Sequence, residues 1–296
     1  MTIITATQAA KQTHRLQGYL SLEFELNQTL GQTTLKVCGQ TLPLKVIRDF
    51  DNGDGEALVH LHNVSRGVID GDYVELDVNL GANSYAQLTT TGATRLYRRY
   101  SDRPSATQIN QIVIGENAFL EMLPDQVIPF AAAVYRLETH IRLAPGAGLF
   151  WWETIAPGRV AAGELFQYEL LDLRFVLYDG QKPIALEHAR PGPGSRSMNS
   201  PVRLGSYRYG STFYICRVGV PPATWLNLEG ELTKLAQQLS RQGECMRGVS
   251  ALVASGLVVR GLAQTGPDAS EGLLAFWEAA KQALYQRQAN PPRKVY

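Results

Sequence analysis

The chain has 296 residues, of which 45% are hydrophobic and 19% are charged, so it can bury a sizeable core and is not a disordered polymer. Its formal net charge of +1 excludes the bulk basicity that is typical of nucleic-acid-binding proteins. The three cysteines, at positions 38, 216 and 245, form no CxxC pair, which argues against a disulfide framework or a zinc ribbon and indicates a reducing compartment.

Alternation of apolar and polar residues dominates roughly the first two-thirds of the chain. The clearest case is YVELDVNL at 73–80, where every second side chain is apolar. Turn signals such as Asn52-Gly53-Asp54-Gly55 and Asp179-Gly180 separate the alternating segments. Because period-two alternation indicates half-buried strands, the sequence predicts a mainly β body of many short strands. The alternating segments are 18–26, 41–47, 56–64, 73–80 and 136–143.

The C-terminal part of the chain changes character after the loop PGPGS at 191–195. A further strand is expected at 212–218, before Pro221-Pro222. The segment 228–241 has leucines at the spacing of an amphipathic helix, and 250–263 returns to a strand pattern.

A second helix is predicted at the end of the chain. It opens at Pro267-Asp268, where Glu271 fits a capping box, and is expected to end before Pro291. No linker demands two separate units, so we predict a single domain over residues 1–296. Its β body would cover about 16–220, and a small region with two α-helices would cover about 221–296.

The sequence gives no sign of secretion or membrane insertion. The first 14 residues lack the charged and apolar regions of a signal peptide. No apolar run approaches the roughly 20 residues that a membrane span needs. We therefore expect a cytoplasmic protein that binds no membrane.

The chain lacks the short motifs that mark common enzyme families. It contains no P-loop, no GxGxxG after a strand, no GxSxG and no HExxH. Residues 49–60 resemble the start of an EF-hand, but Asp54 stands where that loop needs glycine, so we interpret them as a polar hairpin loop. His60 and His62 share one strand face, but no third ligand is near them, so they are only a weak alternative metal contact.

A cluster of arginine and tyrosine residues follows the threonine-rich run at 89–94. On a strand its arginines divide between two faces, which weakens the case for nucleic acid. Because arginine and tyrosine dominate interface hot spots, a protein–protein role is favoured over a solvated strand end and over nucleic acid. The cluster comprises Arg95, Tyr97, Arg98, Arg99, Tyr100 and Arg103.

Four acidic residues stand in sequence contexts where a carboxylate is poorly solvated. Each is explained either by pairing with an arginine, such as Arg159 or Arg190, or by a wet channel in which it is a weak ligand for a divalent cation. A β-rich hydrolase that uses two of these carboxylates is the alternative from a different class of protein. The four residues are Asp72, Glu153, Glu164 and Glu187, of which Glu153 and Glu164 are the hydrolase candidates.

Four blocks of sequence, taken together and in order, resemble the urease accessory protein D family, which is also called H. The likeness covers the chain from about Gly18 to the terminal helix. The blocks are LHNVSRGVIDGD at 61–72, TTGATRLYR at 90–98, LEMLPDQVIPF at 120–130, and WE at 152–153 followed by GR at 158–159 and GE at 163–164.

This resemblance implies a non-enzymatic scaffold with a stacked-sheet or β-helical body and two C-terminal helices. It implies a role in assembling the nickel centre of urease, together with accessory protein F, the GTPase accessory protein G and apo-urease. The missing P-loop is then explained, because GTP hydrolysis belongs to a partner. The resemblance implies no stably bound cofactor and no nucleic acid, but a transient passage of nickel(II) through the interior.

The resemblance also supplies candidate residues for the lining of that passage. Arg66 and Asp70 stand where the family commonly has glycine, and Arg95 where it often has lysine. Since Arg66 and Asp70 lack the freedom of glycine at positive φ, we expect the first turn of this region to have a different shape from the turn in other family members. By position in the blocks, the candidates for the polar passage are Asp72, Thr94, Arg95, Glu153, Glu164 and Glu187.

Overall fold

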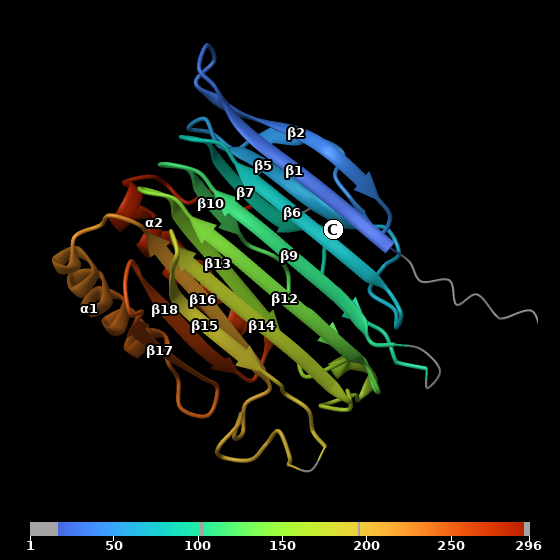
Figure 1. Cartoon of the computed structure of the whole chain (residues 1–296). Coiled ribbons are helices and arrows are strands. Elements are labelled where there is room, and N and C mark those ends of the chain that lie inside the picture. The colour runs from blue at the N-terminus through green and yellow to red at the C-terminus, as the bar shows by residue number, and fades with distance from the viewer. Residues whose placement is uncertain (1–16, 101–103, 195, 293–296) are drawn as a thin grey trace, which may run out of the picture.

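The computed structural model describes residues 17–100, 104–194 and 196–292, and it contains two stacked β-sheets with two helices against the outer face of the larger sheet (Figure 1). Within these residues the smaller sheet has seven strands, and its outermost strands are antiparallel to their neighbours. In spatial order they are β15 (Lys182–Ala189), β14 (Leu170–Asp179), β12 (Val134–Leu143), β9 (Ala106–Ile114), β6 (Tyr73–Leu80), β1 (Gln17–Asn27) and β2 (Gln32–Thr41).

The larger sheet joins strands from both ends of the chain. Along its main path lie β17 (Cys245–Ala251), β18 (Gly256–Ala263), β16 (Tyr209–Arg217), β13 (Gly148–Ile155), β10 (Phe119–Met122), β7 (Tyr85–Thr90), β5 (Ala57–Asn63) and β3 (Leu44–Lys45). Short strands at its margins are β4 (Asp49–Asp51), β8 (Thr94–Leu96) and β11 (Val127–Pro129). The remaining elements are the helices α1 (Pro222–Leu239) and α2 (Gly266–Tyr285) and the short 3₁₀ turn η1 (Val160–Ala162).

The chain passes back and forth between the two sheets. From β5 to β14 it alternates between the larger and the smaller sheet, and the long neighbouring strands in each are parallel. The turn signals at 81–83 and 145–146 are therefore corners that join strands of different sheets, whereas Asp179-Gly180 lies at a true hairpin. The prediction of a mainly β fold with C-terminal helices is confirmed, and the body has the stacked, β-helical course.

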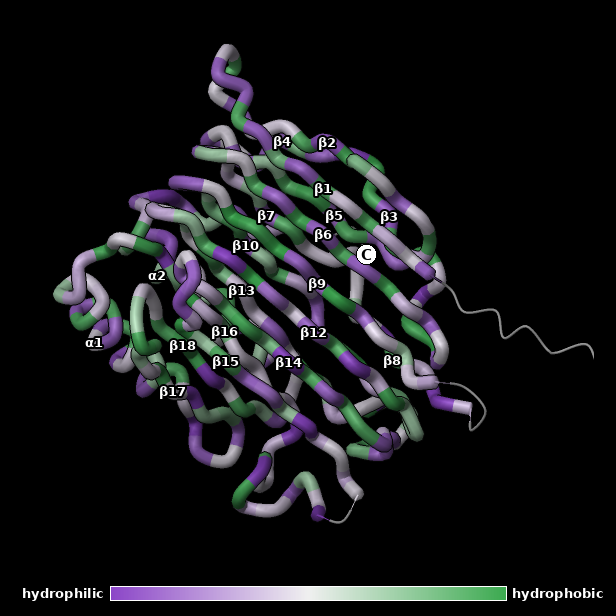
Figure 2. Tube along the Cα trace, in the orientation of Figure 1, coloured by the Kyte–Doolittle hydropathy of each residue, from purple (hydrophilic) through white to green (hydrophobic). Residues whose placement is uncertain are grey.

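The predicted alternation along the strands places the core between the sheets. In β6, the side chains of Val74, Leu76, Val78 and Leu80 are all buried, while the residues between them face outward. Figure 2 shows the same change of hydropathy from residue to residue along the neighbouring strands. One hydrophobic cluster packs between the sheets, and a second packs the two helices on the outer face of the larger sheet.

Both predicted helices are present, with different boundaries. α1 begins six residues before the predicted start, at Pro222, and Trp225 extends its buried stripe. α2 begins at Gly266, and its cap is Thr265, whose Oγ1 accepts a hydrogen bond from Asp268 N at 3.3 Å. The predicted Asp268–Glu271 capping box is therefore wrong, because Asp268 is itself within the first turn. No helix in the part of the chain that the structure describes is long and apolar enough to cross a membrane.

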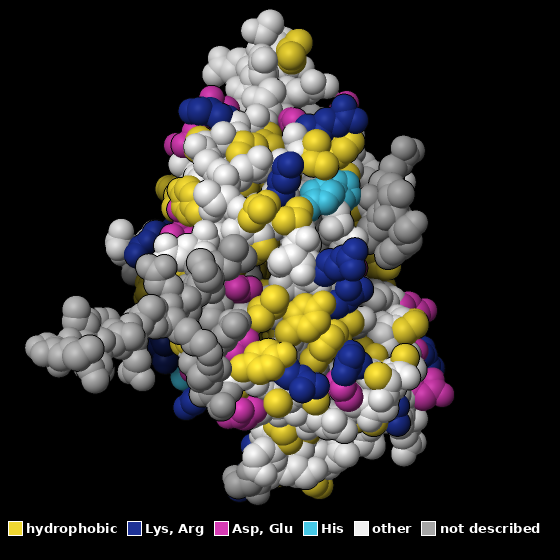
Figure 3. Space-filling model, turned by 90° about the vertical axis from the view of Figure 1, so that its right-hand side faces the viewer, with side chains coloured by type: hydrophobic (Ala, Val, Ile, Leu, Met, Phe, Trp, Pro, Cys, Tyr) yellow, Lys and Arg dark blue, Asp and Glu magenta, His cyan; other side chains and the backbone are white. Residues whose placement is uncertain are grey.

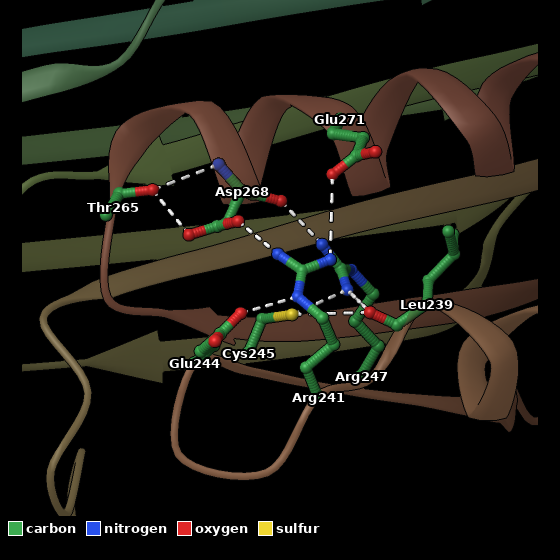
Figure 4. A network of polar contacts seen from close by, with 8 residues as sticks. All are labelled: Leu239, Arg241, Glu244, Cys245, Arg247, Thr265, Asp268 and Glu271. Carbon is green, nitrogen blue, oxygen red and sulfur yellow. Dashed lines mark hydrogen bonds and ion pairs between the residues drawn. The ribbon is translucent and has the colours of Figure 1, made fainter.

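Two arginines, Arg241 between α1 and β17 and Arg247 within β17, hold the start of α2 in place (Figure 4). Arg247 donates to the main-chain oxygen of Asp268 at 2.5 Å and also to that of Leu239 at the end of α1. Arg241 binds the side chains of Glu244 and Asp268, and its Nη1 lies 3.9 Å from a carboxylate oxygen of Glu271. Glu271 thus contacts a neighbouring element instead of capping its own helix.

The segment 41–47 departs from the predicted strand. β2 ends at Thr41, the peptide bond between Leu42 and Pro43 is cis, and a new short strand begins at Leu44. Leu42, expected on the buried face, is 56% exposed, whereas Val46 is buried. Of the three cysteines, all of which are free thiols, Cys216 and Cys245 are buried and Cys38 is exposed.

Candidate functional site

Two cavities lie between the stacked sheets, beside the hydrophobic cluster that packs there. The larger has a volume of about 570 Å³ and the smaller about 260 Å³. Both draw their lining from strands of both sheets, because the side chains that face inward from β12, β13 and β14 reach them. The two cavities adjoin, since they share the lining residues Leu137, Glu153, Ile155 and Leu173.

Glu153 stands at the junction of the two cavities. It is two residues after Trp151 on β13, so both side chains point inward, and Trp151 Nε1 donates to Glu153 Oε1 at 3.0 Å. Burial raises the pKa of Glu153, the tryptophan hydrogen bond opposes this, and the nearby Glu187 carboxylate adds to the rise. Glu153 is therefore a carboxylate that gains a proton more readily than an ordinary glutamate.

Glu187 lines the larger cavity from the edge of the smaller sheet. Arg260, on β18 of the opposite sheet, donates to its two oxygens at 2.8 and 3.0 Å, and the Tyr214 hydroxyl donates to one of them. Burial alone would raise the pKa of Glu187, but the hydrogen bonds from Arg260 and Tyr214 hold that pKa below its usual value. Glu187 thus stays ionised near neutral pH. Its pKa is lowered, whereas the pKa of Glu153 is raised.

The smaller cavity carries hydroxyl, amide and carboxylate groups. Thr94 and Arg95, from β8, are among its lining residues. Thr90 Oγ1 accepts from Asp125 N at 2.8 Å and donates to Asp125 Oδ2 at 3.3 Å, which fixes these two oxygens at its wall. Asn110 donates to Thr139 at 3.1 Å on the side of the smaller sheet. Oxygen ligands of this kind bind divalent cations weakly when they are few and spread apart.

Two of the sequence candidates lie outside both cavities. Asp72 is buried beneath the turn that precedes β6, where its Oδ2 accepts from Ile69 N at 2.9 Å. Glu164 is bound by Arg159, with Nε to Oε2 at 2.8 Å, and accepts from Ala131 N at 3.2 Å. The structure thus brings Thr94, Arg95, Glu153 and Glu187 to the cavities and leaves Asp72 and Glu164 apart. Glu153 and Glu164, the pair considered for hydrolysis, do not line a common cavity.

The two histidines of β5 are only partly buried. The ring of His60 packs edge-on against Phe50 with the centroids 5.6 Å apart. Burial lowers the pKa of His62, and the positive charges of His60 and Lys45 lower it further. Among the described residues, no three His, Cys, Asp or Glu side chains are grouped so that they could hold a metal ion.

Sequence reasoning missed several lining residues. Arg260 and Tyr214 contact Glu187 from 73 and 27 positions away, so nothing near Glu187 in the sequence points to them. Arg260 did carry a signal, as a charged residue inside the apolar strand pattern of 250–263. Trp151 carried another, because it shares a strand face with Glu153.

Comparison with known proteins finds similar sequences over most of the chain. A family profile described as UreD urease accessory protein matches residues 16–296. A protein from Herpetosiphon aurantiacus named urease accessory protein UreD is 43% identical, over 98% of this chain and all of the relative. Proteins of the same name from Pseudomonas aeruginosa and Pseudomonas fluorescens are 34% and 30% identical, over 85% and 89% of this chain and 85% and 90% of theirs.

Proposed function

Because the chain belongs to the UreD urease accessory protein family, which supports a role in urease maturation, we propose that it is a non-catalytic chaperone that offers nickel(II) a passage to the urease centre. In this proposal it acts within a cytoplasmic complex with accessory protein F and the GTPase accessory protein G on apo-urease. Nickel is cargo and passes between the two sheets. The observation that carries the proposal is the pair of adjoining cavities that meet at Glu153.

The lining of these cavities suits transfer better than storage. A tight site needs several carboxylate, histidine or cysteine ligands around one point, and the cavities instead spread their carboxylates. Glu153 lies at the junction, Glu187 in the larger cavity and Asp125 in the smaller one. A cation that meets few carboxylates at any point, with hydroxyl and amide oxygens along the way, is held weakly enough to move on.

Protonation of Glu153 would tune this path. Because burial raises the pKa of Glu153, a larger share of this carboxylate is neutral in mildly acidic solution than for an ordinary glutamate. A neutral carboxyl group is a poor nickel ligand, so transfer should be faster at higher pH. Glu187 keeps its negative charge. The Arg260 guanidinium, which donates two hydrogen bonds to it, compensates that charge until a cation arrives.

The test is maturation of urease in cells that express apo-urease and accessory proteins F and G, with and without this chain. We expect the chain to raise urease activity and the nickel content of the enzyme. Glu153→Gln, which keeps the shape of the side chain, should reduce nickel incorporation while the accessory proteins still assemble. Glu231→Gln, at an exposed position on α1, is the matched control. Equal activation without the chain would contradict the chaperone role, and full activation by Glu153→Gln would contradict the passage.

A further inference from the structure

An arginine-tyrosine face lies at one end of the sheets, where four separate segments converge. It includes a depression of about 470 Å³. Two of its side chains are strongly exposed for their type, Tyr100 at 55% and Ile69 at 37%. Figure 3 shows a side of the molecule on which hydrophobic side chains gather between Lys or Arg side chains. We define the face by Ile69, Tyr97, Arg98, Tyr100, Phe130 and Arg159.

The aromatic part of this face is held in place before any partner arrives. The rings of Tyr97 and Phe130 meet edge to face with centroids 5.0 Å apart. The guanidinium of Arg159 lies 4.4 Å from the centre of the Phe130 ring, and Glu164 fixes that guanidinium. A surface that is already ordered loses little side-chain entropy on binding, which favours its use as an interface.

The charge of the face and its border is positive. Arg159 is compensated by Glu164, and the neighbouring Arg99 is compensated by Glu169 at 3.0 and 3.2 Å. Three other arginines, which are exposed, have no carboxylate at ion-pair distance among the residues that the structure describes. They are Arg66, Arg95 and Arg98.

This positive surface borders the smaller cavity. Arg66 and Arg95 line that cavity, and Tyr97 next to them belongs to the face. The Tyr97 hydroxyl also lies 3.5 Å from the main-chain oxygen of Arg66. A divalent cation that approaches the cavity from here meets uncompensated positive charge, which repels it.

We propose that the arginine-tyrosine face docks an acidic segment of a protein partner. Carboxylates of the segment would pair with Arg95 and Arg98, and its apolar side chains would cover Tyr100 and Ile69. This docking would also compensate the charge beside the cavity and so admit a cation only when the partner is bound. The inference rests on the proposed function for the existence of such partners, and it adds where and by which chemistry one of them binds.

A protein fits this face better than a nucleic acid does. Bases stack on free aromatic faces, but the Phe130 ring carries the Arg159 guanidinium and packs against Tyr97. Mixed aromatic, aliphatic and arginine side chains with a charged rim are typical of protein interfaces.

The test is a binding measurement with the full-length chain and two purified probes, accessory protein F and apo-urease, at about 50 and 300 mM NaCl. We expect the double variant Arg95→Glu, Arg98→Glu to bind at least one probe at least about tenfold more weakly, with a smaller loss of affinity at high salt than the wild type. The control is Arg142→Glu with Lys182→Glu, at exposed positions on β12 and β15, and it should stay within about twofold.

A third variant guards against misfolding as an explanation. Tyr100→Ala removes a ring that is 55% exposed and should weaken the same interaction, while thermal unfolding of the double variant should match the wild type. Unchanged binding of both probes by the double variant overturns the proposal, as does a wild-type chain that binds neither probe. Binding of a single-stranded oligonucleotide that the double variant loses, with protein binding intact, overturns it in favour of nucleic acid. Failure of the chain to activate urease would count against the proposed function alone, because the binding constants are measured without nickel or activity.

Discussion

Glu187 on β15, the edge strand of the smaller sheet, pairs with Arg260 on β18, the second strand of the larger sheet, with nitrogen–oxygen distances of 2.8 and 3.0 Å. No main-chain hydrogen bond ladder connects these two strands, since they belong to different sheets. The ion pair therefore lies across the side of the larger cavity and holds two elements that hydrophobic packing leaves apart there.

Arg260→Gln should destabilise the protein modestly at neutral pH. The loss is about 1 kcal/mol, because the arginine is 56% exposed and solvent screens the pair. The pKa of Glu187 is lowered in the folded protein, so the contribution of the pair is present above the unfolded pKa and is lost as pH falls through the folded value. Urea unfolding of Arg260→Gln and wild type at pH 7 and pH 3 measures this contribution, and the difference between the two proteins should be smaller at pH 3. A difference that is equally large at both pH values would contradict the prediction.

A buried charge network binds α2 to the larger sheet. Lys281, only 1% exposed, lies 2.7 Å from Glu121 and 3.0 Å from Glu56, and Trp277 Nε1 donates to Glu121 at 2.5 Å. Burial alone would lower the pKa of Lys281, but the two carboxylates raise it, so the lysine is charged. The helix is thus fixed by an ammonium group in a site closed to water.

Lys281→Met should cost about 3–5 kcal/mol of unfolding free energy, because it leaves a buried carboxylate without its cation. Lys234→Met, at an exposed position on α1, is the control and should change stability by less than about 0.5 kcal/mol. Guanidinium unfolding monitored by tryptophan fluorescence gives both values. Similar, small effects of the two substitutions would show that the network adds nothing to stability.

One ammonium group compensates only one of the two carboxylates, and the second holds a proton. Burial and the neighbouring Glu121 carboxylate raise the pKa of Glu56 from 4.5 to about 8. Between pH 4.5 and about 8, Glu56 keeps its proton in the folded protein but releases it in the unfolded chain. The free energy of unfolding therefore falls as pH rises through this range.

Glu56→Gln should therefore flatten the dependence of stability on pH between about 5 and 8. The variant carries no proton to lose, so its stability relative to wild type should rise across this range by a few kcal/mol, on the order expected for a shift of this size. The measurement is the free energy of unfolding in urea at several pH values, with Glu231→Gln as the control. Parallel pH profiles for Glu56→Gln and wild type would refute the assignment of the proton to Glu56.

The sequence predicted the faces of the strands well but not their partners. Alternation in 73–80 shows which side chains of β6 are buried, yet it contains nothing about the neighbour of β6, which is β9 on one side and β1 on the other. The stacked, β-helical course followed from the family resemblance, since the corners at 81–83 and 145–146 look the same in sequence as hairpin turns. Strand pairing depends on contacts between segments that are far apart in the chain.

The candidate site was only partly predictable for the same reason. The family resemblance pointed to Glu153 and Glu187, which line the cavities, but also to Asp72 and Glu164, which hydrogen bonds hold elsewhere. Lys281 did carry an overlooked signal, because it follows Trp277 by four residues and so lies on the apolar side of α2. A lysine in such a stripe predicts a buried partner, although the partner itself, 160 positions away, cannot be read from the sequence.

The turn before β6 adopts positive φ despite its arginine, which differs from the expectation for Arg66. Arg66 has a φ of 66°, and Gly67 after it has a φ of 156°. A Cβ on Gly67 would lie 2.5 Å from the main-chain oxygen of Arg95, which already accepts a hydrogen bond from Val68 N at 2.8 Å. The main chain of this turn therefore packs directly on β8, and only glycine permits that approach.

Gly67→Ala should thus lower the unfolding free energy by about 2 kcal/mol or more, since both the positive φ and the contact with Arg95 oppose a methyl group. Gly92→Ala is a matched control, because Gly92 lines the same cavity but a Cβ there would meet nothing within 4 Å. We expect the control to stay within about 0.5 kcal/mol of wild type. Chemical unfolding of both variants gives the comparison. If Gly67→Ala were as stable as Gly92→Ala, the turn would be free to move away from β8, and the close contact with Arg95 would not be a constraint on the fold.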